Sequence, residues 1–154
     1  MRIHVPIHLR WADLDAYNHV NNVEMMRLLE EARVRVFWVP DSPDDEKLAT
    51  AVLDASAGAD TLTLIARHEI EYLRPLSYQR QPVDVQVWIG RIAAASAEVC
   101  YEVYEQGVAG PCARSSSTMV FIDAASQRPR RINEREREAW APYIEEPVVF
   151  GSRR

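Results

Sequence analysis

The chain has 154 residues, of which 47% are hydrophobic and 27% are charged, and its formal net charge is −5 at pH 7. This mixture fits one globular domain that can bury a core without a metal or a disulfide, and the negative charge argues against nucleic acid or an anionic membrane surface as the main partner. No stretch reaches the roughly 18 apolar residues of a membrane span, and the polar N-terminus is unlike a signal peptide, so we expect a cytoplasmic protein.

The first elements in chain order are a strand and a helix. Residues 3–11 alternate between apolar and polar side chains, which predicts a half-buried strand, and Pro6 favours an edge strand or a bend because it cannot donate to a ladder. Residues 22–37 have apolar side chains at helical spacing and predict an amphipathic helix. Arg33 falls inside the apolar sector of this helix and needs a partner, for which Glu30 is nearest.

The second half of the chain is rich in strands. Residues 41–60 predict a loop with a short helical piece near 46–55. The short connections between the strands that follow indicate an antiparallel meander. These strands are expected at residues 61–75, 83–92, 97–105 and 113–123.

The chain ends in a short helix at residues 133–141, where Asn133 and Glu136 have the spacing of a capping box. The order of elements predicts an α+β domain over residues 1–147, with an antiparallel sheet wrapped around one long helix and a flexible tail at 148–154. Open sheet edges favour pairing between chains, so we expect a dimer. Cys100 and Cys112 lack a CxxC motif and are expected to be reduced, buried thiols.

The start of the long helix is well specified. Asn21 is the expected N-cap, Asn22 the first helical residue, and Glu24 the capping-box partner of Asn21. Val20 and Met25 have the spacing of a hydrophobic staple. The backbone amide of Asn22 then lacks an intrahelical partner at the positive end of the helix dipole. Such an amide can bind water, bind an anion or polarise a carbonyl.

Side chains capable of chemistry precede this helix. Asp13 and Asp15 are two residues apart, and His19 follows. The carboxylates can accept loop amides, one of them can act as a general base or nucleophile, or both can bind a metal together with His19. The residues alone leave these alternatives open.

The pattern formed by Arg10, Asp13, Asp15 and His19-Val-Asn-Asn22, followed by Leu29-Glu-Glu-Ala-Arg33, resembles the 4-hydroxybenzoyl-CoA thioesterase family of the hot-dog fold. Further points of resemblance are Tyr72-Leu-Arg-Pro-Leu76, Asp123 and Arg128-Pro129.

This resemblance implies hydrolysis of an acyl-CoA thioester. It places the catalytic carboxylate on Asp15 and the carbonyl-polarising amide on Asn22, with His19 as a further candidate catalytic residue or as an organiser of the loop. Asp15 would either attack the carbonyl or deprotonate a water molecule. Neither a metal nor a cofactor is required, because the thiolate of CoA is a good leaving group.

The resemblance also implies a homodimer or homotetramer whose active sites are shared between chains. The substrate-binding candidates are Tyr17, Met25, Tyr72, Arg74 and Arg91. Met25 stands where many relatives have a tyrosine, and Ala93–Ala95 stands where some relatives carry a basic cluster for the phosphates of CoA. A hot-dog hydratase or dehydratase and a non-catalytic acyl-binding module are the alternatives.

Overall fold

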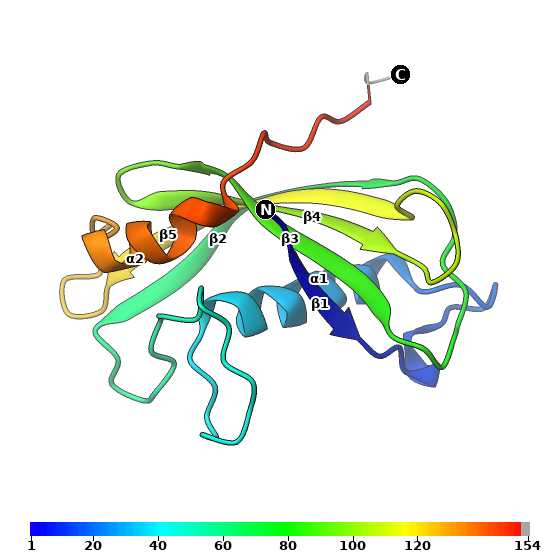
Figure 1. The fold of residues 1–154 in the computed structure, drawn as a ribbon, viewed down its shortest axis with the longest axis horizontal. Helices are drawn as coiled ribbons and strands as arrows, with labels where there is room; N and C mark the ends of the chain where they lie inside the picture. Colours follow the sequence, from blue (N-terminus) through cyan, green and yellow to red (C-terminus); the bar gives the residue numbers. More distant parts are fainter. Residues whose placement is uncertain (152–154) are drawn as a thin grey trace.

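Five antiparallel strands form one curved sheet in the order β1-β3-β4-β5-β2 (Figure 1). The computed structural model describes residues 1–151. The strands are β1 (Ile3–Ile7), β2 (Thr61–Tyr72), β3 (Val83–Ile92), β4 (Ser96–Tyr104) and β5 (Ala113–Asp123). The α+β class and the antiparallel sheet expected from the sequence are therefore confirmed.

The expected meander is only partly correct. Strands β3, β4 and β5 pair in sequence order, but β2 pairs with β5, and β3 pairs with β1. Residues 73–82 therefore carry the chain from one side of the sheet to the other, instead of forming a hairpin. Strands β1 and β2 become the two edges of the sheet, and Pro6 lies on an edge strand, as its missing N–H requires.

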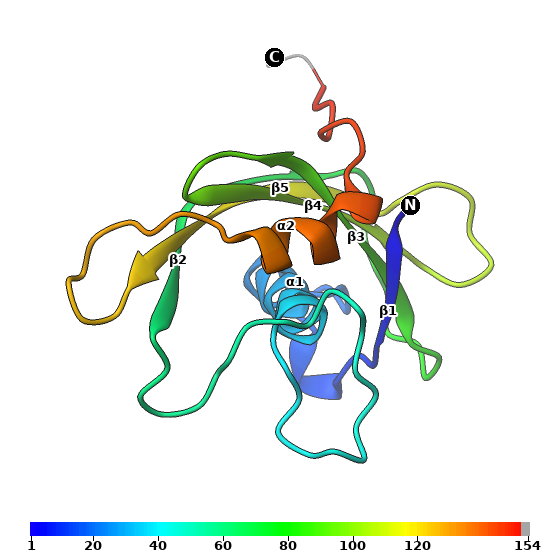
Figure 2. The ribbon, with the colours of Figure 1, turned by 60° about the vertical axis from the view of Figure 1, so that its left-hand side comes forward.

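Helix α1 (Asn22–Phe37) has the bounds that the sequence predicts, and the sheet curves around it (Figure 2). One face of the helix joins the concave face of the sheet in the hydrophobic core. Burial of these apolar side chains is the main force that holds α1 in place. The buried apolar residues of α1 are Met25, Leu28, Leu29, Ala32, Val36 and Phe37.

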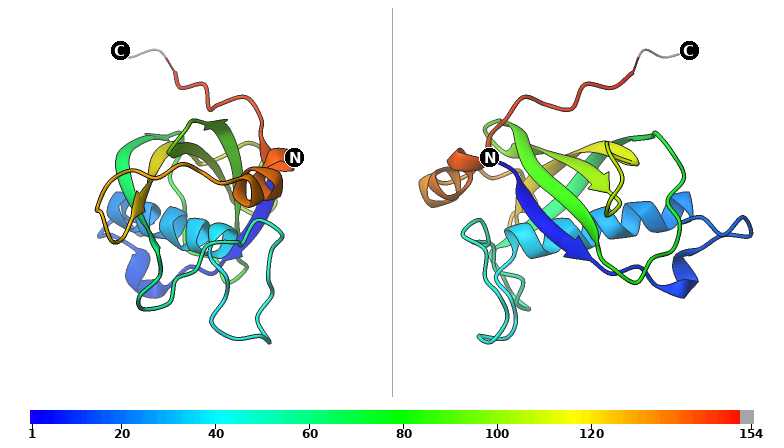
Figure 3. Two further views of the ribbon diagram at one scale, coloured as in Figure 1. Left: turned by 90° about the vertical axis from the view of Figure 1, so that its left-hand side faces the viewer. Right: turned by 45° about the vertical axis from the view of Figure 1, so that its right-hand side comes forward.

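The C-terminal end of α1 is covered by a second helix, α2 (Glu134–Trp140), whose N-cap Asn133 forms the expected capping box with Glu136 (Figure 3). The Trp140 ring lies 5.3 Å from the Phe37 ring, edge to face. The short 3-10 turns are η1 (Trp11–Asp13) and η2 (Ala141–Tyr143).

The prediction of a short helical piece near residues 46–55 is wrong, because the structure has no helix there. The amides of Val52 and Leu53 instead donate to the carbonyl of Phe37, and the amide of Val39 donates to the carbonyl of Leu53. This stretch therefore uses its backbone groups to satisfy the end of α1 and not to build a helix of its own.

The C-terminal segment lies against the sheet as far as residue 151. The indole of Trp88 donates to the carbonyl of Glu146, and the amide of Gly151 donates to the Glu71 carboxylate. Residues 152–154 of the expected tail lie outside the described residues. Cys100 and Cys112 are buried and unpaired within residues 1–151, and no helix in that range is long and apolar enough to cross a membrane.

Candidate active site at the start of helix α1

The segment before α1 folds back on itself as a small antiparallel loop. Asp15 N–H donates to the carbonyl of His19 (2.8 Å), and Asn21 N–H donates to the carbonyl of Asp13 (2.8 Å). Between these bonds, Leu14 and Val20 form an antiparallel bridge. The loop therefore holds Asp15 in a fixed place opposite His19, on the segment that leads into the helix.

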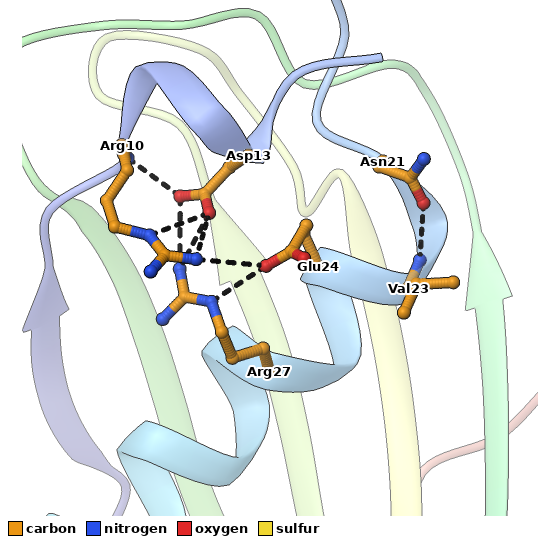
Figure 4. Close-up of polar contacts among 6 residues, drawn as sticks. All are labelled: Arg10, Asp13, Asn21, Val23, Glu24 and Arg27. Carbon is orange, nitrogen blue, oxygen red and sulfur yellow. Dashed lines mark hydrogen bonds and ion pairs between the residues drawn. The ribbon is translucent and has the colours of Figure 1, made fainter.

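Asp13 anchors this loop through two arginines (Figure 4). Its fully buried carboxylate accepts hydrogen bonds from the backbone amide of Arg10 (2.7 Å), from the Arg10 guanidinium (2.9 and 3.0 Å) and from Arg27 Nη2 (2.9 and 3.0 Å). Glu24 completes the network by accepting from both guanidiniums. Because α1 supplies Arg27 and Glu24, the network fastens the loop to the first turns of the helix.

The same contacts control the charge of Asp13. Burial alone would raise the pKa of this carboxyl, but the hydrogen bonds from Arg10 and Arg27 outweigh burial and hold the pKa below its usual value. Asp13 is therefore an ionised, fully engaged structural group, and both of its oxygens are occupied. The alternative of a metal bound by Asp13, Asp15 and His19 gains no support, since no group of three potential metal ligands is present in residues 1–151.

Asp15 is in a different state. Its Oδ1 accepts the backbone amides of Tyr17 (2.8 Å) and His19 (3.3 Å), while Oδ2 has no hydrogen-bond partner among residues 1–151. The side chain is half-buried. The loop amides thus fix the orientation of the carboxylate and leave one oxygen available for reaction.

Asn21 is the N-cap of α1, as the sequence predicts, but the prediction of a capping box between Asn21 and Glu24 is wrong. The side chain of Asn21 accepts from the amide of Val23 (2.9 Å). Glu24 does not return a bond to Asn21, because Arg10 and Arg27 take its carboxylate and the carbonyl of Asp13 takes the Asn21 amide. The amide of Asn22 has no hydrogen-bond acceptor within the described part of the chain.

The structure brings only some of the candidate residues together. Tyr72 lies at the helix start, where its hydroxyl donates to the carbonyl of Asn22 (3.0 Å). Tyr17 is 81% exposed at the tip of the loop, while Met25 is buried in the core of the chain. His19 contributes its backbone to the loop, and its ring makes no hydrogen bond within residues 1–151.

The two arginine candidates lie apart from this group. Arg74 forms an ion pair with Glu105 (2.6 Å) and donates to the carbonyl of Gly110, so its charge is already compensated. Arg91 lies exposed on β3, next to a register shift in its pairing with β4. Neither one joins the loop of Asp15 within the chain.

Sequence reasoning missed the roles of Arg27 and Glu24 as partners of Asp13. The available signals were the three-residue spacing of Arg10 and Asp13 and the charged side chains of Glu24 and Arg27 on the first turns of α1. They did not lead to the network because Arg27 is 14 residues from Asp13, and only the folded loop brings the two together.

Comparisons with known proteins place the chain in a family. A family model described as the thioesterase-like superfamily matches residues 9–140, which include the loop, α1 and all strands except β1. No curated protein matches the chain.

Solved structures with a similar fold cover nearly the whole chain. The PA5185 protein of Pseudomonas aeruginosa strain PAO1 has 23% identity and a TM-score of 0.75, covering 95% of this chain and 94% of its own. A predicted thioesterase from Bacillus stearothermophilus has 23% identity and a TM-score of 0.74, covering 96% and 100%. At this level of identity, the likeness of both concerns the fold.

A thioesterase from Thermus thermophilus, solved in complex with coenzyme A and Zn, has 25% identity and a TM-score of 0.68 and covers 95% of each chain. The residues that the family model matches span most of this chain and include the loop and α1. The chain therefore belongs to the thioesterase-like superfamily.

Proposed function

We propose that the protein is an acyl-CoA thioesterase of the hot-dog fold, similar to the 4-hydroxybenzoyl-CoA thioesterases, with α1 as the central helix. It would hydrolyse an acyl-CoA to a carboxylic acid and free CoA. The membership of the superfamily supports thioester hydrolysis in general, and the structural neighbour solved with coenzyme A supports CoA as the thiol component.

One observation carries the proposal. Asp15 has a free carboxylate oxygen on a loop that ends at Asn22, whose amide is free at the positive end of a 16-residue helix. A free amide at this position is suited to a carbonyl oxygen that gains negative charge, because the helix dipole adds to the hydrogen bond. The carboxylate of Asp15 on the same loop would supply the attacking group or the base.

The reaction follows from these two groups. The thioester carbonyl oxygen accepts a hydrogen bond from the Asn22 amide, and the carbonyl carbon faces Oδ2 of Asp15. Either Oδ2 attacks this carbon and water later hydrolyses the mixed anhydride, or Oδ2 takes a proton from the water that attacks. In both routes the C–S bond breaks, and the CoA thiolate leaves and takes up a proton.

We further propose that two chains share each site in a homodimer or homotetramer in the cytoplasm. The edge strand β2 leaves its outer backbone groups without a neighbouring strand, and Leu62 and Leu64 on it are 43% and 57% exposed. An open apolar edge of this kind favours pairing with a second copy. Tyr72 ends this strand at Asn22 and would lie close to the junction.

Replacement of the proposed carboxylate tests the function. Asp15→Asn should lower kcat for thiol release from acyl-CoAs by roughly 10²-fold or more, as expected for loss of a general base or nucleophile. Asp54→Asn is a matched control, because Asp54 Oδ1 accepts the amide of Ser56 at 2.8 Å in the same kind of local turn, away from the site. Both variants should unfold at a temperature close to that of the wild type.

Activity of Asp15→Asn within about threefold of the wild type would refute the assignment of Asp15. Addition of water to an enoyl-CoA without thiol release would favour the hydratase alternative. Binding of acyl-CoA without turnover by the wild type would favour a non-catalytic acyl-binding module.

A further inference from the structure

Arg33 is a buried cation with few partners. It lies on α1 with 6% of its surface exposed. Its Nη1 donates one hydrogen bond, to the hydroxyl of Tyr101 (3.2 Å), and its Nη2 lies 3.8 Å from the carboxylate of Glu30, whose side chain is 70% exposed. A guanidinium has five N–H donors, and a buried charge is costly unless it is paired and hydrogen-bonded. Arg33 therefore retains capacity for an anion.

Arg33 belongs to a group of neighbouring polar side chains that we call the polar cluster: Arg33, His68, Tyr101 and Ser117. Tyr101 and Ser117 are buried, and Nδ1 of His68 lies 2.6 Å from the Ser117 hydroxyl. Burial and the charge of Arg33 lower the pKa of His68, so its ring is neutral at pH 7. Its Nε2 has no hydrogen-bond partner within residues 1–151.

His68 is the member of the polar cluster on β2, the strand that ends at the proposed reaction site. Tyr72 marks the helix start through its bond to Asn22, and His68 is four residues earlier on the same strand, a separation of about 13 Å at the rise of a strand. Ile70 lies between Tyr72 and His68 along β2, and Met26 lies between Asn22 and Arg33 along α1; both are partly buried apolar side chains packed against the core. These two apolar residues thus separate the free amide of Asn22 from the buried guanidinium of Arg33.

From this arrangement we infer that the protein acts on acyl-CoAs whose acyl chain carries a carboxylate at its far end. The inference rests on the proposed function. With the thioester carbonyl at the Asn22 amide, an extended chain lies over Ile70 and Met26, and its terminal carboxylate binds the guanidinium of Arg33. Nε2 of His68 donates a second hydrogen bond in the tautomer that places its proton there. A methyl terminus would leave Arg33 with only Tyr101 and the exposed Glu30 as partners.

A matched pair of substrates tests this selectivity. Medium-chain acyl-CoAs with a terminal carboxylate are compared with methyl-terminated acyl-CoAs of equal length, by the kcat/KM of thiol release. The wild type should prefer the carboxylate by roughly tenfold or more, because a site with a buried polar group rejects a ligand that cannot pair with it. Equal or higher kcat/KM for the methyl-terminated series would overturn the inference.

Variants connect the preference to Arg33. Arg33→Met keeps the length of the side chain and removes its charge, and it should abolish the preference for the carboxylate-terminated chain. Arg35→Met is the matched control: Arg35 is exposed on the same helix, pairs with Glu31, and should leave the preference unchanged. His68→Leu, at the more exposed edge strand, should reduce the preference even where Arg33→Met fails to fold. Retention of the full preference in Arg33→Met or in His68→Leu contradicts the inference.

A binding measurement separates the failure of this inference from that of the proposed function. If no thioester is hydrolysed, the proposed function fails, but calorimetry with the free dicarboxylic acid and the monocarboxylic acid of equal length still tests the polar cluster. Tighter binding of the dicarboxylic acid, lost in Arg33→Met and kept in Arg35→Met, supports the inference. Equal binding of the two acids overturns it.

Discussion

The two ends of helix α1 differ in shape and in charge. The C-terminal end adjoins a cavity of about 560 Å³ between β1, α1 and the loop of residues 39–55, and Glu31, Asp41, Asp45 and Glu46 are among its lining residues. At the N-terminal end, the carboxylates of Asp13 and Glu24 are neutralised by Arg10 and Arg27, and this end carries the free amide of Asn22 and the oriented carboxylate of Asp15.

This difference shows why volume alone is a poor guide to the site. The C-terminal end of a helix is the negative end of its dipole, and Asp41, Asp45 and Glu46 add to it, whereas Glu31 is paired with Arg35. We therefore expect this cavity to disfavour an anionic group such as the phosphates of CoA. The N-terminal end has the positive end of the dipole, and we propose that the reaction takes place there. The pocket that the acyl group needs there would be completed by a second chain along the open edge of β2.

The largest expected effect concerns the amide at the N-terminal end. Asn22→Pro removes this N–H and should lower kcat for thiol release by roughly 10²–10³-fold, the range for loss of an oxyanion donor. Proline is tolerated structurally at the first helical position, and Asn21 already has the extended backbone (φ −60°, ψ 141°) that a following proline requires. Asn22→Ala keeps the amide and should stay within threefold of the wild type. A Pro variant as active as the Ala variant would move the oxyanion role elsewhere.

The next effect concerns the network that fixes the N-terminal end. Asp13→Asn leaves Arg10 and Arg27 without their buried counter-charge and should lower the free energy of unfolding by about 3 kcal/mol. Because the pKa of Asp13 is depressed in the folded protein, its contribution is complete above the usual carboxyl range near pH 4, and it is lost as the pH falls through the folded value. Urea unfolding at pH 7 and at pH 3 measures both effects.

The control for this network lies on an exposed part of the same helix. Glu31→Gln breaks an exposed ion pair with Arg35 and should cost less than about 1 kcal/mol. If the difference in stability between wild type and Asp13→Asn were as large at pH 3 as at pH 7, the stabilisation would not come from the ionised carboxylate.

The contrast between regions also explains what the sequence could predict. The bounds of α1 and most strands followed from local periodicity, and the N-cap at Asn21 followed from a local side-chain preference. The pairing of β2 with β5 could not be predicted in this way, because strand order depends on contacts between residues far apart in the chain.

The site shows the same division. Asp15 and the Asn22 amide were identified by spacing and by the family resemblance, and their catalytic roles stay predictions. The capping box was wrong because Arg27 competes for Glu24, a contact that local spacing does not weigh against capping. The partner expected for Arg33 was found at 3.8 Å, but the hydrogen bond to Tyr101 joins residues 68 positions apart and was not foreseen.

The smallest expected effect tests the cavity at the C-terminal end of α1. Val34 lines this cavity and is 45% exposed, so Val34→Trp should fill part of it without disturbing the core. If the acyl group binds at the N-terminal end, kcat/KM for every acyl-CoA should stay within about threefold of the wild type. A loss of kcat/KM that grows with acyl chain length would instead mean that the acyl chain enters this cavity. The acyl group would then bind at the C-terminal end of α1 and not at the N-terminal end. Equal values across the series would leave the amide of Asn22 and the edge of β2 as the region that selects the substrate.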